Sequence, residues 1–298
     1  MEHIIKSLKP VALFVAGAVV FVLGTAFLIA SDATLSPSSL GASNDLAQAG
    51  RWLQFLAGAC VLGAVCTAGW ELVLRSEWAA SAEVAAAAVG TLLLTIGLLA
   101  SAASNGSGPA ASVIGAVGIG IWALLVLSRA ARVSLAEQGP TQGAVPGTAQ
   151  GAAQGAAPGM QTTVPGIQGG RGRQADLWLA AAIGLFILAI GYGFTSAASS
   201  RGPGIAAGLL EAAGVAALAW SVAAARSRGL LHSRPVSSAL TGLGLLAVSF
   251  LAAAVVAGLA FGTLSAMGTG LAVVTAVELA GVVALGLAAW TRVRELYR

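Results

Sequence analysis

Long apolar runs alternate with short polar or charged segments along the whole chain. Each run is long enough to cross a bilayer, whose hydrocarbon core of about 30 Å requires roughly 20 residues of helix. The eight predicted spans are Pro10–Ala30, Trp52–Leu74, Ala79–Ser101, Ala110–Arg132, Leu177–Ala198, Gly204–Ala225, Ser238–Gly262 and Gly268–Thr291. None of them shows the period-two alternation that a membrane β-barrel requires. The pattern therefore predicts an all-α, polytopic transmembrane helical bundle.

Basic residues gather at alternate ends of these spans. If the N-terminus is cytoplasmic, 13 of the 15 Lys and Arg residues fall on the cytoplasmic side, and only Arg51 and Arg201 fall outside. This is the asymmetry of the positive-inside rule, and adding or removing one span would destroy it. We therefore expect both termini to be cytoplasmic. Arg outnumbers Lys 13 to 2 and Ala and Gly abound, which is typical of a GC-rich bacterial genome and predicts the cytoplasmic (inner) membrane of a bacterium.

Composition supports the membrane assignment. Charged residues make up 9% of the chain, hydrophobic residues 57%, and the mean hydropathy is +0.89. A soluble domain carries about 25% charged residues, so these charges are too few to cover a water-facing surface. The net charge of +4 does not indicate nucleic acid, because no basic cluster has the interleaved aromatic residues that stack on bases. The expected partners of the basic residues are the anionic head groups of the lipid bilayer.

The segment between the fourth and fifth runs differs from the rest of the chain. Residues 133–175 are rich in Gly, Ala, Gln and Pro, and no charge occurs between Glu137 and Arg171. Such a segment cannot bury enough apolar surface to offset the entropy of ordering it. We predict a disordered cytoplasmic linker at 133–175, between an N-terminal four-helix half at 1–132 and a C-terminal four-helix half at 176–298.

The two halves resemble each other. Trp70 and Trp220 close the second span of each half, and Arg75 and Arg226 follow them. Because four spans is an even number, both halves would have the same orientation, as in a parallel 4+4 repeat. The alternative is two unrelated units that look alike because hydropathy and topology force the same pattern on both.

Two carboxyl groups lie deep within predicted spans, where a charge is costly and marks a functional candidate. Glu211 lies about 10 Å into the sixth span, counted from Gly204, and Glu278 about 15 Å into the eighth, counted from Gly268. If these helices face each other, the pair could share a proton or hold a cation, and Thr275, one turn away, would offer a further oxygen. The alternative is two separate carboxyls, each kept protonated by its apolar surroundings.

Other candidates have simpler interpretations. Glu71 and Glu83 lie near cytoplasmic ends of spans, where they can reach interfacial water. Small residues at a spacing of four let helices approach closely. This spacing predicts helix packing at two pairs, Gly204 with Gly208 and Gly258 with Gly262.

Signatures of catalysis are absent from the sequence. It has no phosphate-binding glycine loop, no GxSxG and no HExxH. His3 and His232 are isolated, and Cys60 and Cys66, six residues apart in one apolar run, point to different sides of a helix. We therefore expect no enzyme, no metal and no cofactor.

Two hypotheses for function remain open. The first is a non-enzymatic membrane component, contacting a partner membrane protein or a second copy of the chain through the linker and through a predicted outer loop at 31–50 with Asp32 and Asp45. The alternative is a small carrier or a proton- or ion-coupled transporter that uses Glu211 and Glu278.

Overall fold

The protein is an integral membrane protein built from α-helices. The computed structural model describes residues 2–75, 78–104, 109–138, 172–194, 201–229, 234–259 and 263–296. Within these residues it has eight helices and no strand, and each helix contains a span long and apolar enough to cross a membrane. The predicted all-α, eight-span bundle is confirmed.

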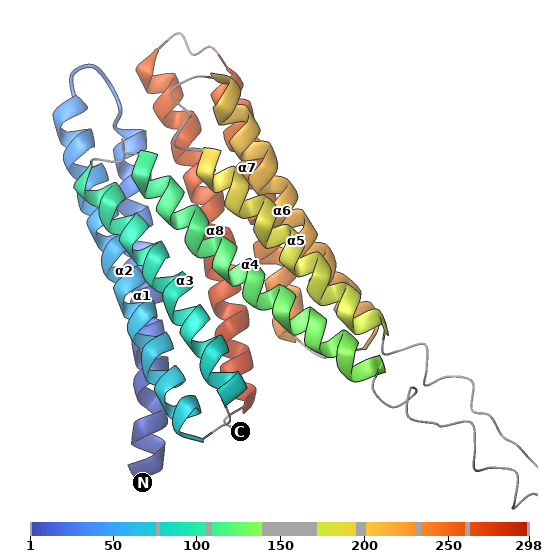
Figure 1. The fold of residues 1–298 in the computed structure, drawn as a ribbon. Coiled ribbons are helices and arrows are strands. Elements are labelled where there is room, and N and C mark those ends of the chain that lie inside the picture. Colours follow the sequence, from blue (N-terminus) through green and yellow to red (C-terminus); the bar gives the residue numbers. More distant parts are fainter. Residues whose placement is uncertain are drawn as a thin grey trace, which may run out of the picture.

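Consecutive helices run in opposite directions, so both termini lie at one end of the bundle (Figure 1). We call this the terminal end and the opposite one the far end. The helices are α1 (Glu2–Ala33), α2 (Leu40–Arg75), α3 (Trp78–Ala103), α4 (Pro109–Gln138), α5 (Gly172–Phe194), α6 (Arg201–Ser227), α7 (Arg234–Gly258) and α8 (Leu264–Leu296).

The eight helices form a closed ring. Each helix packs against the helices before and after it in the sequence, and α1 packs against α8. No other pair of helices brings its backbones together within the described residues. The halves α1–α4 and α5–α8 therefore meet at two seams, α4–α5 and α1–α8, and every helix has one face toward the interior of the ring.

Paired glycines mark places where the two helices of a hairpin cross closely. One pair lies in each hairpin: Gly24 with Gly50, Gly90 with Gly118, Gly184 with Gly214, and Gly242 with Gly281. A Cβ added to any of these glycines would lie 2.7–3.1 Å from the carbonyl oxygen of its partner. Since any side chain would collide with backbone, glycine is what permits these approaches.

The predicted packing glycines lie mainly between α6 and α7. A Cβ at Gly208 would lie 2.8 Å from the carbonyl oxygen of Phe250 on α7, and one at Gly258 would lie 3.4 Å from Cδ1 of Ile205 on α6. Gly204 lies in the first turns of α6 and is partly buried. Gly262 lies outside the described residues.

The predicted outer loop at 31–50 is wrong. Helix α1 continues to Ala33 and α2 begins at Leu40, so most of this segment is helical. The hydroxyl of Ser31 donates to the carbonyl oxygen of Ser43 at 2.8 Å, and the hydroxyl of Ser43 donates to the carbonyl oxygen of Ser31 at 3.0 Å. Small polar residues lower the hydropathy of the segment, but they face the neighbouring helix and satisfy each other there.

The edges of the predicted linker are also helical. Helix α4 continues past Arg132 to Gln138, and α5 begins at Gly172. The sequence VSLAEQ contains no helix breaker, whereas Gly139 and Pro140 follow directly. Residues 139–171 lie outside the described residues, so a disordered linker stays a prediction.

Candidate functional site

Glu211 points from α6 into the interior of the ring. The exposed face of α6 is formed by Leu209, Ala213, Ala216 and Trp220. At about 100° per residue, Glu211 lies on the opposite side of the helix, and it is only 7% exposed.

A glycine of α5 packs directly on α6 beside Glu211. A Cβ at Gly191 would lie 2.8 Å from Cγ of Glu211, 2.9 Å from its backbone nitrogen and 3.1 Å from the carbonyl oxygen of Ala207. Gly191 thus lets the two helix backbones approach each other closely at the level of Glu211.

Glu278 points inward from α8 in the same way. The exposed face of this helix includes Val273, Ala280, Val283 and Leu287, and Glu278 lies opposite to it. The residue is partly buried. It lies fourteen residues after Leu264, or about 21 Å along the helix, close to the middle of the span Leu264–Thr291.

Tyr192 on α5 is a third polar group on the interior side. The exposed residues of this part of α5 are Ile183, Ile190 and Phe194, and Tyr192 lies opposite to them. Its ring packs directly on Gly115 of α4. Sequence reasoning missed this residue, although its place opposite an aliphatic face was a signal that could have found it.

These three groups come together although their helices are not all neighbours. Helices α6 and α8 do not pack on each other in the described part of the chain, because α7 lies between them. Glu211 and Glu278 nevertheless lie on the interior sides of their helices, near enough for an electrostatic effect of Glu278 on Glu211 and of both on Tyr192. The interior of the ring thus holds two carboxyl groups and one phenol.

The two carboxyls have no compensating base. No Lys or Arg among the described residues contributes to the electrostatics of either group, and neither group receives a hydrogen bond from a described residue. An isolated carboxylate in apolar surroundings is strongly disfavoured. Chemically, this pair can hold a proton or take up a cation.

Thr275 belongs to a different polar group. Its hydroxyl lies 3.4 Å from Oδ2 of Asp32 on α1 and donates to the carbonyl oxygen of Leu271 at 3.0 Å. Asp32 also interacts electrostatically with Arg51 of α2. The structure therefore places Thr275 in a second polar group of α1, α2 and α8, toward the far end, rather than against Glu278.

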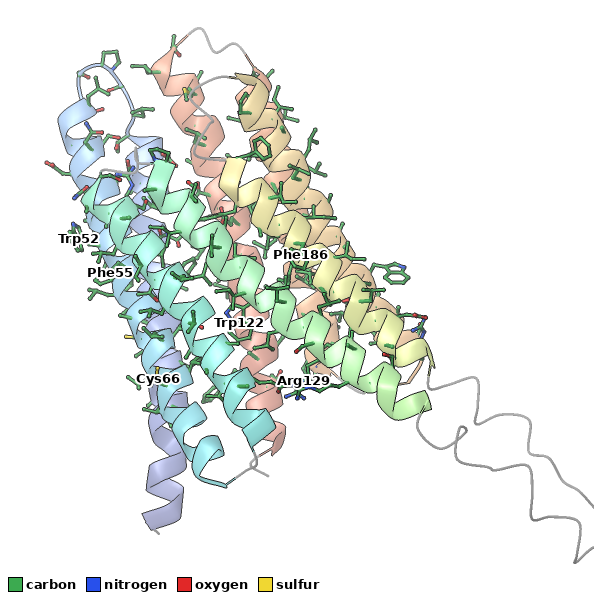
Figure 2. All side chains as sticks on the ribbon, viewed as in Figure 1. Trp52, Phe55, Cys66, Trp122, Arg129 and Phe186 are labelled. Carbon is green, nitrogen blue, oxygen red and sulfur yellow. The ribbon has the colours of Figure 1, made fainter. Side chains whose placement is uncertain are left out.

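Glu83, by contrast, is fully paired by basic residues. Its carboxylate forms ion pairs with Arg129 and with Arg132 of α4, the latter at 2.8 Å, and its side chain is 12% exposed. Figure 2 shows Arg129 near the terminal end of the bundle. This triad joins α3 to α4, and nothing about it requires a proton or a ligand.

A metal centre finds no support in the described part of the chain. It contains no group of three or more His, Cys, Asp or Glu residues that could hold a metal ion. Cys60 is partly buried and Cys66 is exposed, and both are free thiols. Figure 2 shows Cys66 together with Trp52 and Phe55 along the outer side of α2, where the two aromatic rings meet edge to face with centroids 6.0 Å apart.

Comparisons do not assign the chain to a family. It matches no family model, no curated protein and no solved structure. The function is therefore inferred from the residues of the site itself.

Proposed function

We propose that the protein is a small, non-enzymatic carrier that exchanges a proton for a cation at Glu211 and Glu278. A single observation carries this proposal: Glu211 of α6 and Glu278 of α8 both lie on the interior side of the ring, and no Lys or Arg among the described residues forms an ion pair with either. The proposal favours the carrier hypothesis over the membrane-component hypothesis, because an ordinary bundle has no use for such a pair.

An ionised carboxylate is costly in the interior of the ring. An ionised carboxylate at the middle of a bilayer costs at least about 2.5 kcal/mol on insertion scales. Two carboxylates that repel each other cost more than two separate ones. Binding one proton or one cation relieves both costs, so the pair favours a singly occupied state and makes the two ligands compete.

The architecture offers a route to transport. The site lies in the α5–α8 half and faces the α1–α4 half across the interior, and the halves meet at two seams. Movement of one bundle against the other around a central site is a common mode of alternating access. We propose that the halves move in this way, with the terminal end in the cytoplasm of a bacterium, because the basic residues gather at that end.

Proton release provides the most direct test. The purified protein in weakly buffered detergent solution would be mixed with sodium, potassium or tetraphenylphosphonium chloride, and released protons measured with a pH dye. We expect up to one proton per chain for the cation that binds. Glu211→Gln and Glu278→Gln should each reduce the release, because one of the two carboxyls is lost. The double variant should abolish it, because a neutral amide has no proton to exchange.

Asp45→Asn is the matched control, since Asp45 is an exposed carboxyl at the far end of α2. It should release protons like the wild type. Equal release by the wild type and by the Glu211→Gln, Glu278→Gln double variant would contradict the proposal.

One observation favours a second candidate, a subunit of a larger membrane assembly. The part of α1 nearest the terminal end is exposed on several sides, including Phe14, Ala16 and Val19. A partner protein or a second copy could cover it. Native mass spectrometry in mild detergent should then show a defined complex, and repeated recovery of a monomer would count against this candidate.

A further inference from the structure

The α1–α8 seam is closed at the far end. Gly268 of α8 packs directly on the backbone oxygen of Asp32, and a Cβ at this glycine would lie 2.8 Å from Cβ of Leu35. The Thr275 hydroxyl meets the Asp32 carboxylate one to two turns further along α8. At this end the two helices leave no space between them.

The same face of α8 opens onto space further along the helix. Gly286 lies eighteen residues after Gly268, which at about 100° per residue is five full turns and returns to the same face. A Cβ at Gly286 would meet nothing within 4 Å. Gly286 is partly buried, but the side of α8 that touches α1 at the far end has room for a side chain here.

The face of α1 that meets α8 also becomes more exposed toward the terminal end. Asp32 lies on the face of α1 that meets α8. Phe14 lies eighteen residues earlier, or five full turns, and so on the same face. It is 41% exposed, and Ala18, one turn away from it, is exposed as well. The two helices therefore diverge toward the terminal end, where the ribbons of α1 and α8 end apart from each other in Figure 1.

This opening lies within the membrane-spanning segments. Phe14 and Ala18 belong to the span Pro10–Ala33, and Gly286 belongs to the span Leu264–Thr291. The opening therefore faces the acyl chains of the leaflet at the terminal end, and its sides are apolar. Glu278, on the interior side of α8, lies eight residues from Gly286, or about 12 Å along the helix.

We propose that the α1–α8 seam is a lateral entrance from the bilayer through which a lipophilic organic cation reaches Glu278 and Glu211. The proposal rests on the carrier function, because it uses the same carboxyl pair. A solute that passes through lipid must carry enough apolar surface to dissolve there, and one that binds a carboxylate pair must carry positive charge. A cation with apolar substituents meets both conditions, whereas a hydrated inorganic ion does not dissolve in the leaflet.

Closing the seam tests the entrance. In proteoliposomes with an imposed proton gradient, Gly286→Phe should take up tetraphenylphosphonium about tenfold more slowly than the wild type, as for a barrier raised by about 1.4 kcal/mol. Ala18→Phe, which narrows the seam from α1, should have the same effect if Gly286→Phe does not fold. Gly244→Phe is the matched control, because Gly244 of α7 is exposed and a Cβ there also meets nothing within 4 Å.

Equilibrium proton release separates this proposal from the carrier function. Gly286→Phe should release as many protons as the wild type when tetraphenylphosphonium is added in detergent and given time, while the Glu211→Gln, Glu278→Gln double variant releases none. Uptake by Gly286→Phe and Ala18→Phe at the wild-type rate would overturn the entrance and leave the carrier standing. A dimeric wild type that becomes monomeric in Gly286→Phe would also overturn it, because a second copy would then fill the seam. Absence of proton release from the wild type would overturn both.

Discussion

The α4–α5 seam and the α1–α8 seam both join the two halves of the ring, but they are built differently. On α4, Ala116 contacts Gly193 of α5, since a Cβ at that glycine would lie 3.6 Å from Cβ of Ala116. Ala123 and Ala130 follow at intervals of seven residues on the same face and are 0% and 6% exposed. Small, mostly buried residues thus follow this face of α4 over several turns, although a Cβ at Gly120 on the same face would meet nothing within 4 Å.

The α1–α8 seam has no such continuous row. Its contact at Gly268 and Asp32 is as close as any in the molecule, but the same faces are open at Ala18 and Gly286. Buried small residues therefore extend over more of the α4–α5 seam than of the α1–α8 seam. We expect the halves to articulate at the α4–α5 seam and to separate at the α1–α8 seam.

The largest effect should come from enlarging a residue in the closed seam. Ala123→Leu inserts a branched side chain where no surface is exposed, and overpacking of this kind costs about 1–3 kcal/mol of the free energy of unfolding. Ala18→Leu makes the same change in the open seam and should alter stability by less than about 0.5 kcal/mol. Unfolding by SDS titration in mixed micelles would measure both. Equal losses would mean that the open seam is packed as tightly as the closed one.

An intermediate effect should distinguish the two ends of the α1–α8 seam. Gly268→Ala places a methyl group against the backbone oxygen of Asp32, which forces α1 and α8 apart and should cost about 1 kcal/mol or more. Gly286→Ala places the same methyl group in open space and should be neutral or slightly stabilising, because alanine is the better helix former. Comparing the thermal unfolding midpoints of the two variants in the same detergent tests this pair. A destabilised Gly286→Ala with an unchanged Gly268→Ala would reverse the assignment of closed and open ends.

Hydropathy alone sufficed to predict the helices and their number, because the cost of exposing polar groups to lipid acts on each span separately. It failed at the start of α2, where Ser43 and Gln48 lower the hydropathy but make contacts with α1 and α3. The amide of Gln48, for example, donates to the carbonyl oxygen of Ala102 at 3.0 Å. Polar groups that form hydrogen bonds between helices therefore lower the hydropathy of a helical segment until it resembles a loop.

The candidate site was only partly predictable for a similar reason. The burial of Glu211 and Glu278 follows from their position in apolar runs, but their interaction depends on the closure of the ring, which spacing along the chain does not encode. Thr275 illustrates the limit most clearly. It lies one turn from Glu278, yet three residues turn a helix by about 300°, which leaves the two side chains about 60° apart. That angle is enough for one to face α1 and the other the interior.

The smallest predicted effect concerns this threonine and sharpens the comparison at the closed end of the seam. Thr275 and Thr269 both donate to the carbonyl oxygen four residues earlier on α8, at 3.0 and 2.9 Å, but only Thr275 also reaches a side chain of another helix. Thr275→Val keeps the shape and removes that contact. Hydrogen bonds between membrane helices average about 0.6 kcal/mol, so we expect a loss of this size for Thr275→Val and almost none for Thr269→Val. If the contact holds α1 against α8, Thr275→Val should also increase the labelling of an Ala18→Cys thiol by a membrane-permeant maleimide, in a background without Cys60 and Cys66. Unchanged labelling together with an unchanged free energy of unfolding would show that Gly268 alone closes the far end.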